Sequence, residues 1–201
     1  MSRSKSFTFA IAIVAMLLLS ASVLSQEAKL PSTADEVVRS GMTALGQLDI
    51  ETYTSLMHPS DMETFQQMLW PILEGRIADD SSGQEGTLAQ MFGVEVIDGK
   101  PQPVDAREFF AKFMNFMVNV SPDLKRAMTD VEYVVIGGVP EGDTLMHYVV
   151  RAYITLNETS GSSTDIVTLR KAGDNWRLAL SGELKEIAGT IRQQLTGNSG
   201  R

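Results

Sequence analysis

Residues 131–181 read VEYVVIGGVPEGDTLMHYVVRAYITLNETSGSSTDIVTLRKAGDNWRLALS, and this stretch decides the fold. Apolar and polar residues alternate in it with a period of two, as they do in strands that bury one face. Gly173-Asp174 stands between two apolar runs and supplies the turn chemistry of a hairpin. The pattern predicts strands at 131–137, 144–156, 164–171 and 175–181, joined by the loops VPEGD, NETSGSS and AGDN.

The chain before this stretch has helical periodicity. Thr33-Ala-Asp-Glu36 and the overlapping Ser32-Thr-Ala-Asp35 fit a capping box at the start of a first helix. A short second helix is expected from Ile50 to Met57, because His58 precedes a proline and is pushed out of the helical region. A third helix starts at Ser60-Asp-Met-Glu63, and Pro71 should kink or restart it. Its apolar stripe is Met62, Phe65, Leu69, Leu73 and Ile77.

The most apolar helix is predicted at 105–120, between two polar loops and the first strand. A short helix at 87–92 precedes it, and a short helical turn after Ser121-Pro122 follows it. Its inward residues are expected to be Phe109, Phe113, Phe116, Met117 and Val120. Ser181 should cap a closing helix with Leu184, Ile187, Ala188, Ile191 and Leu195 on one face.

Helices come first along the chain and strands second, which favours the α+β class over alternating βαβ units. We therefore expect N-terminal helices packed on an antiparallel sheet of about four strands, with an additional C-terminal helix. A single domain is predicted at 33–196, after a short linker at 26–32 and before a disordered tail at 197–201.

Residues 1–25 have the pattern of a cleavable secretory signal. Arg3 and Lys5 precede an uncharged stretch from Phe7 to Leu24, and small residues follow it. Val23 and Ser25 suit a cut before Gln26, and a cut after Ser22 is an alternative. An uncleaved membrane anchor is the competing interpretation, weakened by the polar serines within the stretch. We expect export to the periplasm or the medium, with no stable membrane span after cleavage.

Composition excludes several kinds of site and partner. The chain has no cysteine, so it cannot form disulfides, thiolate nucleophiles or cysteine-ligated zinc. Two histidines and no acidic loop of calcium-binding spacing make a metal unexpected, and no cofactor motif is present. The predicted signal contains two of the 17 basic residues and none of the 25 acidic ones, which leaves the mature chain at −10. That charge repels phosphate backbones, so nucleic acid is not an expected partner.

The order of elements, together with the LMHP turn at 56–59 and the GDNWRL hairpin at 173–178, resembles the nuclear transport factor two-like superfamily. The resemblance covers roughly residues 33–181. It implies a cone in which a curved sheet wraps a helix around a pocket. Members use such pockets as ketosteroid isomerases, dehydratases, polyketide cyclases or non-catalytic domains, and none of their catalytic motifs is found here. The long 79–128 insertion and the C-terminal helix depart from the superfamily pattern.

Counting residues across the predicted loops gives a register for the sheet, and the register suggests a site. It places Leu169 opposite Leu178, and Lys171 beside Trp176. A loop centred on Ser160 places Arg151 opposite Leu169 and Tyr153 opposite Val167, while the PEGD loop places Glu132 opposite Arg151 and Ile136 opposite His147. The face with Val134, Ile136 and Val149 would then be the core. The opposite face, with Tyr133, Val150 and Ala152, would be partly wet or an oligomer contact.

The candidate ligand pocket on that predicted core face consists of Glu132, His147, Arg151 and Tyr153. Arg151 would hold an anionic ligand, and His147 or Glu132 would move a proton. The alternative is a structural ion pair, with His147 bonded to a backbone carbonyl. His58 joins the candidates because it stands near Asp61, and its alternative role is that of a turn or capping residue.

Three functions remain open from the sequence. The first is an exported, non-enzymatic domain that binds a small apolar or weakly anionic ligand or an envelope protein, with a homodimer as one arrangement. The second is an acid/base isomerase or dehydratase built on the candidate pocket. The third is a purely structural role, in which the C-terminal helix docks a partner through an exposed apolar stripe.

Overall fold

The computed structural model describes residues 31, 33–78, 85–156 and 159–197. The helices are α2 (Ala34–Gly46), α3 (Ile50–Leu56), α4 (Pro59–Ala78), α5 (Glu85–Phe92), α6 (Ala106–Val120), α7 (Pro122–Thr129) and α8 (Gly182–Gly197). The strands are β1 (Val96–Ile97), β2 (Lys100–Pro101), β3 (Val131–Glu141), β4 (Leu145–Leu156), β5 (Thr159–Ala172) and β6 (Asn175–Leu178). The predicted signal segment, most of the linker and residues 198–201 lie outside the described residues.

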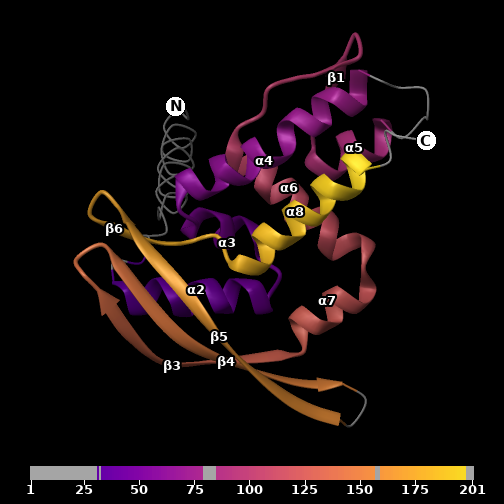
Figure 1. Cartoon of the computed structure of the whole chain (residues 1–201). Helices are drawn as coiled ribbons and strands as arrows, with labels where there is room; N and C mark the ends of the chain where they lie inside the picture. The colour runs from indigo at the N-terminus through magenta and orange to yellow at the C-terminus, as the bar shows by residue number, and fades with distance from the viewer. Residues whose placement is uncertain (1–30, 32, 79–84, 157–158, 198–201) are drawn as a thin grey trace, which may run out of the picture. The chain divides into compact units, whose positions relative to one another are not determined.

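A four-stranded antiparallel sheet in the order β3-β4-β5-β6 forms one layer, and the helices gather on one side of it (Figure 1). The small β1-β2 hairpin is separate from this sheet. The α+β class, the N-terminal helices and the C-terminal helix predicted from the sequence are confirmed. No helix within the described part of the chain is long and apolar enough to cross a membrane.

The β5-β6 hairpin has the predicted register. Leu169 pairs with Leu178 and Lys171 with Trp176. Gly173 has a φ of 62°, a left-handed conformation that glycine adopts without the steric cost of a Cβ. The turn at Gly173-Asp174 was predicted correctly, and the pairing of the two strands followed from it.

The predicted register of β4 is wrong because the NETSGSS segment is mostly strand. β4 runs to Leu156 and β5 begins at Thr159, so the serines after it are paired instead of forming a loop. Ser and Thr are tolerated in a strand where the side chain faces water, and backbone pairing then decides. Arg151 consequently lies opposite Thr164 instead of Leu169. The shift is an odd number of residues, which moves side chains to the other face.

The β3 register also differs from the prediction. Glu132 pairs with Tyr153 instead of Arg151, and Arg151 pairs with Val134. A bulge lies between Val135 and Gly137, so one strand gains a residue relative to its partner.

The two faces of the sheet are therefore exchanged on β3 and β4. The inner face, which the helices cover, carries Tyr148, Val150 and Ala152, all at most 8% exposed. On the outer face Val134 is 39% and Ile136 53% exposed. On these two strands the predicted core face is the solvent face, because the length of each loop sets the register and the loop lengths were predicted wrongly. On β5 and β6 the predicted core residues Leu169 and Leu178 are buried.

The helical core centres on aromatic rings from α4 and α6. The ring of Phe65 lies 5.1 Å from that of Phe110 and 5.0 Å from that of Phe113, and Phe92 stacks on Phe109 at 4.6 Å. The inward positions of Phe109 and Phe113 are confirmed. The predicted inward position of Val120 is wrong, since Val120 is 55% exposed at the end of α6.

The α4 helix runs without interruption through Pro71, so the predicted restart is wrong. Thr33 caps α2 through a capping box with Glu36, as expected.

α8 packs along α4, where Ala188 is fully buried and Leu184 and Ile191 are partly buried against the core. The side chain of Leu195 is not among those described. Ile187 of the same stripe is 36% exposed. The apolar stripe of α8 is thus packed only in part, and the partner-docking role stays a prediction.

Candidate functional site

A cavity of about 840 Å³ lies between the inner face of the sheet and the helices α2, α6 and α8. Its walls combine apolar and polar side chains, and the apolar ones include Met114, Met117, Val150, Val167, Leu184 and Ile187. The inner-face residues come from the period-two alternation of β4 and β5, which aims every second side chain at the helices. The methionines come from the stripe of α6 next to the aromatic core.

Four polar residues of the cavity wall influence one another electrostatically, and we call them the Tyr-acid cluster: Tyr53, Tyr133, Asp165 and Glu183. The four residues come from α3, β3, β5 and the first turn of α8, and all line the cavity. Asp165 pairs with Val150 in the register and so shares the inner face with it. Asp165 and Glu183 are exposed to solvent, whereas Tyr53 is 7% exposed.

Burial raises the pKa of both tyrosines above the ordinary value of a phenol, which is itself neutral near pH 7. Burial raises the pKa of Tyr53 to about 12, with smaller contributions from the nearby phenol of Tyr133 and the carboxylate of Glu183. Burial likewise raises the pKa of Tyr133, and the negative charges of Asp165 and Glu183 add to the effect. Both phenols are therefore neutral near physiological pH, and each can donate or accept a hydrogen bond.

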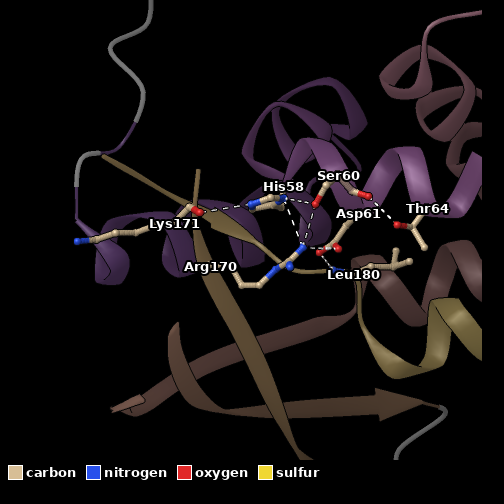
Figure 2. A network of polar contacts seen from close by, with 7 residues as sticks. All are labelled: His58, Ser60, Asp61, Thr64, Arg170, Lys171 and Leu180. Atoms are coloured by element: carbon tan, nitrogen blue, oxygen red, sulfur yellow. Dashed lines mark hydrogen bonds and ion pairs between the residues drawn. The ribbon is translucent and has the colours of Figure 1, made fainter. Parts of the chain in front are cut away.

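A second polar group, the Asp61-Arg170 network, borders the cavity where α4 begins (Figure 2). The Arg170 guanidinium donates to the Asp61 carboxylate at 2.5 Å and to the Ser60 hydroxyl at 3.2 Å. The other oxygen of Asp61 accepts the backbone N–H of Leu180 at 2.9 Å. The network connects the start of α4 to β5 and to the segment that leads into α8. Its contacts therefore indicate a role in stabilising the fold.

His58 lies in this network and not inside the cavity. Its Nδ1 is 2.9 Å from the Ser60 hydroxyl, and its Nε2 is 3.4 Å from the carbonyl oxygen of Lys171 (Figure 2). Its backbone N–H donates to the carbonyl of Leu178 at 2.7 Å. These contacts match the turn-residue alternative.

The other predicted site residues lie on the outer face or at its end. Glu132, Arg151 and Tyr153 share the outer face through the β3-β4 register and are exposed. His147 forms a separate contact, 2.7 Å from Glu141 and 3.0 Å from the Thr168 hydroxyl. None of these residues lines the described cavity. Their ligand-binding role stays a prediction, and the cavity gives it no support.

Sequence reasoning missed the Tyr-acid cluster, although one signal for it was present. Asp165, Val167 and Leu169 occupy alternate positions on β5, so they share a face whatever the register of the sheet. A carboxylate on an otherwise apolar strand face indicates a polar site. Tyr53 and Glu183 gave no comparable signal, since only the packing of α3 and α8 brings them near it.

The fold and the cavity together define an α+β domain in which helices close a pocket on a curved antiparallel sheet. A search of solved structures found an NTF-2 like protein of unknown function from Shewanella oneidensis MR-1. It is 10% identical, the match covers 72% of this chain and 89% of that chain, and the TM-score is 0.38. No protein-family model and no curated protein matches the chain.

Proposed function

We propose that the protein is an exported, non-enzymatic domain that binds a small, largely apolar molecule in the cavity. The observation that carries the proposal is the cavity itself, which is about 840 Å³ in volume and lined by Met, Val, Leu and Ile side chains together with polar residues. Ligand pockets of soluble proteins typically measure about 300–1,000 Å³ and combine apolar walls with a few polar groups.

The composition of the walls supports a flexible apolar ligand. Met114 and Met117 of α6 line the cavity together with Val150 and Val167 of the sheet. Methionine side chains are unbranched and polarisable, so they adapt to apolar molecules of irregular shape. The acid/base enzyme draws no support from the cavity, because Glu132, His147 and Arg151 do not line it.

Binding can be tested with a fluorescent apolar probe, alongside native mass spectrometry of the mature protein purified from its own host. Ala152 lines the cavity and is 8% exposed, so Ala152→Phe should fill part of it and abolish most probe binding. Val134→Phe is the matched control, because Val134 is 39% exposed on the outer face of the same sheet. If Ala152→Phe does not fold, Met117→Trp is used in its place. Met117 lines the cavity from α6, so the larger indole side chain should fill the cavity from the helical side.

Equal probe binding in wild type, the cavity-filling variant and the control would place the probe elsewhere and refute the proposal.

Export is tested separately by fractionating cells that express the full chain and measuring the mass of the product. We expect a mature N-terminus at Gln26 outside the cytoplasm, and a full-length product held in the membrane would contradict this expectation.

A further inference from the structure

We propose that two copies of the chain pack through the outer face of the sheet about a two-fold axis, and that Glu132 of each copy pairs with Arg151 of the other. The proposal goes beyond ligand binding and is independent of the cavity, which lies at the inner face. It follows from exposed apolar side chains, two unpaired charges and the register of β3 with β4.

The outer face of the sheet exposes an unusual share of the large apolar side chains. Eight such side chains are exposed in the part of the chain that the structure describes, and five of them belong to β3, β4 and β5: Val134, Ile136, Val139, Tyr153 and Ile166. The described helices lie on the other side of the sheet and leave this face uncovered (Figure 1). Exposed apolar side chains that gather on one surface indicate an interaction site.

Four outer-face residues form a square in the register, which we call the outer-face quartet: Glu132, Val134, Arg151 and Tyr153. Glu132 lies opposite Tyr153, and Val134 lies opposite Arg151. The two charged side chains therefore occupy one diagonal of the square, and the two apolar side chains occupy the other. Val134 is 39% exposed and Tyr153 is 42% exposed, so both are accessible to a partner.

The two charges of the quartet are not paired within their own chain. Diagonal neighbours on one face of an antiparallel pair are within reach of long side chains. Even so, neither Glu132 nor Arg151 forms an ion pair or a side-chain hydrogen bond with any residue that the structure describes, and both are exposed. Both charges are thus available to a second molecule.

The charge pattern favours a second copy of the chain over other partners. A two-fold contact needs a patch that complements itself, and one acid beside one base meets this requirement. A strongly acidic or strongly basic partner would place its own sign against one of the two charges. The quartet is neutral, whereas the chain after the predicted signal has a charge of −10. Two copies therefore repel each other less at this patch than the whole chain would suggest.

The square also determines the direction of the two-fold axis. In a face-to-face contact the axis lies in the plane of the interface, and an exchange of Glu132 with Arg151 requires it to follow the apolar diagonal. Val134 then meets Val134 of the partner subunit, and Tyr153 meets the partner subunit's Tyr153. Such an axis makes the strands of the two sheets cross at a large angle, as in orthogonal sheet packing. A salt bridge lies on either side of an apolar strip.

The first test is sedimentation equilibrium of the mature protein at pH 7 with reversed charges. We expect wild type to dimerise as its concentration rises. Glu132→Arg alone and Arg151→Glu alone should each weaken the dimer by about tenfold or more, because like charges then meet twice. An equimolar mixture of the two single variants should dimerise again, since both of its charge pairs have opposite signs. Glu63→Arg on α4 makes the same charge change at an exposed residue away from the sheet and should have no effect.

The second test uses the absence of cysteine from the chain. Val134→Cys and Tyr153→Cys should each give a disulfide-linked dimer under mild oxidation, because each residue meets its own copy on the axis. Glu63→Cys is the control and should give little linked dimer. The three positions are exposed, so the variants should fold normally.

Three results would overturn the proposal: a wild type that sediments as a monomer throughout, a mixture of folded single variants that stays monomeric, or a Glu63→Arg variant that acts like Glu132→Arg. If the charge variants do not fold, the cysteine variants decide, and equal yields of linked dimer from Val134→Cys and Glu63→Cys overturn it. Binding of the apolar probe should be the same in the charge variants as in wild type. Failure of the dimer with normal probe binding leaves the proposed function standing.

Discussion

Asp61→Ala should destabilise the protein far more than the removal of another aspartate that also pairs with an arginine. The Asp61 carboxylate is 13% exposed and receives two hydrogen bonds, from the Arg170 guanidinium at 2.5 Å and from the Leu180 N–H at 2.9 Å. Hydrogen bonds to charged groups contribute about 1.5–3 kcal/mol each. Arg170 is 37% exposed and water replaces part of its lost contact, so the lower end of that range applies to it.

We therefore expect Asp61→Ala to lower the free energy of unfolding by about 3–4 kcal/mol. The matched control is Asp35→Ala, which breaks a bridge to Arg39 of 2.7 Å between side chains that are 53% and 57% exposed. Such exposed pairs within one helix contribute about 0.3–0.5 kcal/mol. Both bridges join aspartate to arginine, so burial and the Leu180 contact are the main differences.

The assay is urea denaturation at pH 7, and the transition midpoint and the slope m are measured for wild type, Asp61→Ala and Asp35→Ala. A double-mutant cycle combines Asp61→Ala with Arg170→Met. A coupling energy of about 1 kcal/mol is expected from the cycle. Equal midpoints for the two aspartate variants, or a coupling energy near zero, would refute the structural role assigned to the network.

Three further predictions concern protonation, an unsatisfied group and glycine. Tyr53 has a folded pKa of about 12, so its contribution to stability is complete below pH 10 and is lost as the pH rises through 12. Alkaline denaturation should therefore cost wild type up to about 2–3 kcal/mol more than Tyr53→Phe, and parallel curves would contradict this. Arg177 has a buried Nη1 with no hydrogen bond to the described residues, so Arg177→Met should raise the stability by about 1 kcal/mol in urea melts. A lower midpoint would show that the guanidinium is satisfied. Gly75→Ala in the interior of α4 has no atom within 4 Å of the new Cβ and should stabilise by about 0.5–1 kcal/mol, whereas Gly173→Ala at φ 62° should destabilise by about 1 kcal/mol. Thermal melts of the pair check both signs, and equal shifts would argue against the turn geometry.

Local signals in the sequence were sufficient for the elements and the fold class. Capping residues such as Thr33 and Asp105 act on the turn that follows them, so the starts of α2 and α6 could be predicted. Gly173 fixed the β5-β6 register for the same reason, since a tight turn leaves no choice of pairing.

The register of β3 with β4 and of β4 with β5 could not be predicted. The β4-β5 register depends on whether residues 159–163 pair or form a loop, and both outcomes suit their Ser, Thr and Gly side chains. The β3-β4 register depends on the turn between Glu141 and Leu145 and on the bulge between Val135 and Gly137. An odd error in that choice exchanges the two faces, which is why Arg151 was placed in the core and lies outside it.

The sequence by itself determined an α+β chain with a helical first half, four strands and a closing helix, because periodicity and caps are properties of neighbouring residues. Tertiary structure alone decided the site. Tyr53, Tyr133, Asp165 and Glu183 are more than a hundred residues apart at the extremes, and only the packing of α3 and α8 over the inner face brings them together. Contacts of such separation depend on the register and on helix placement, which no local pattern encodes.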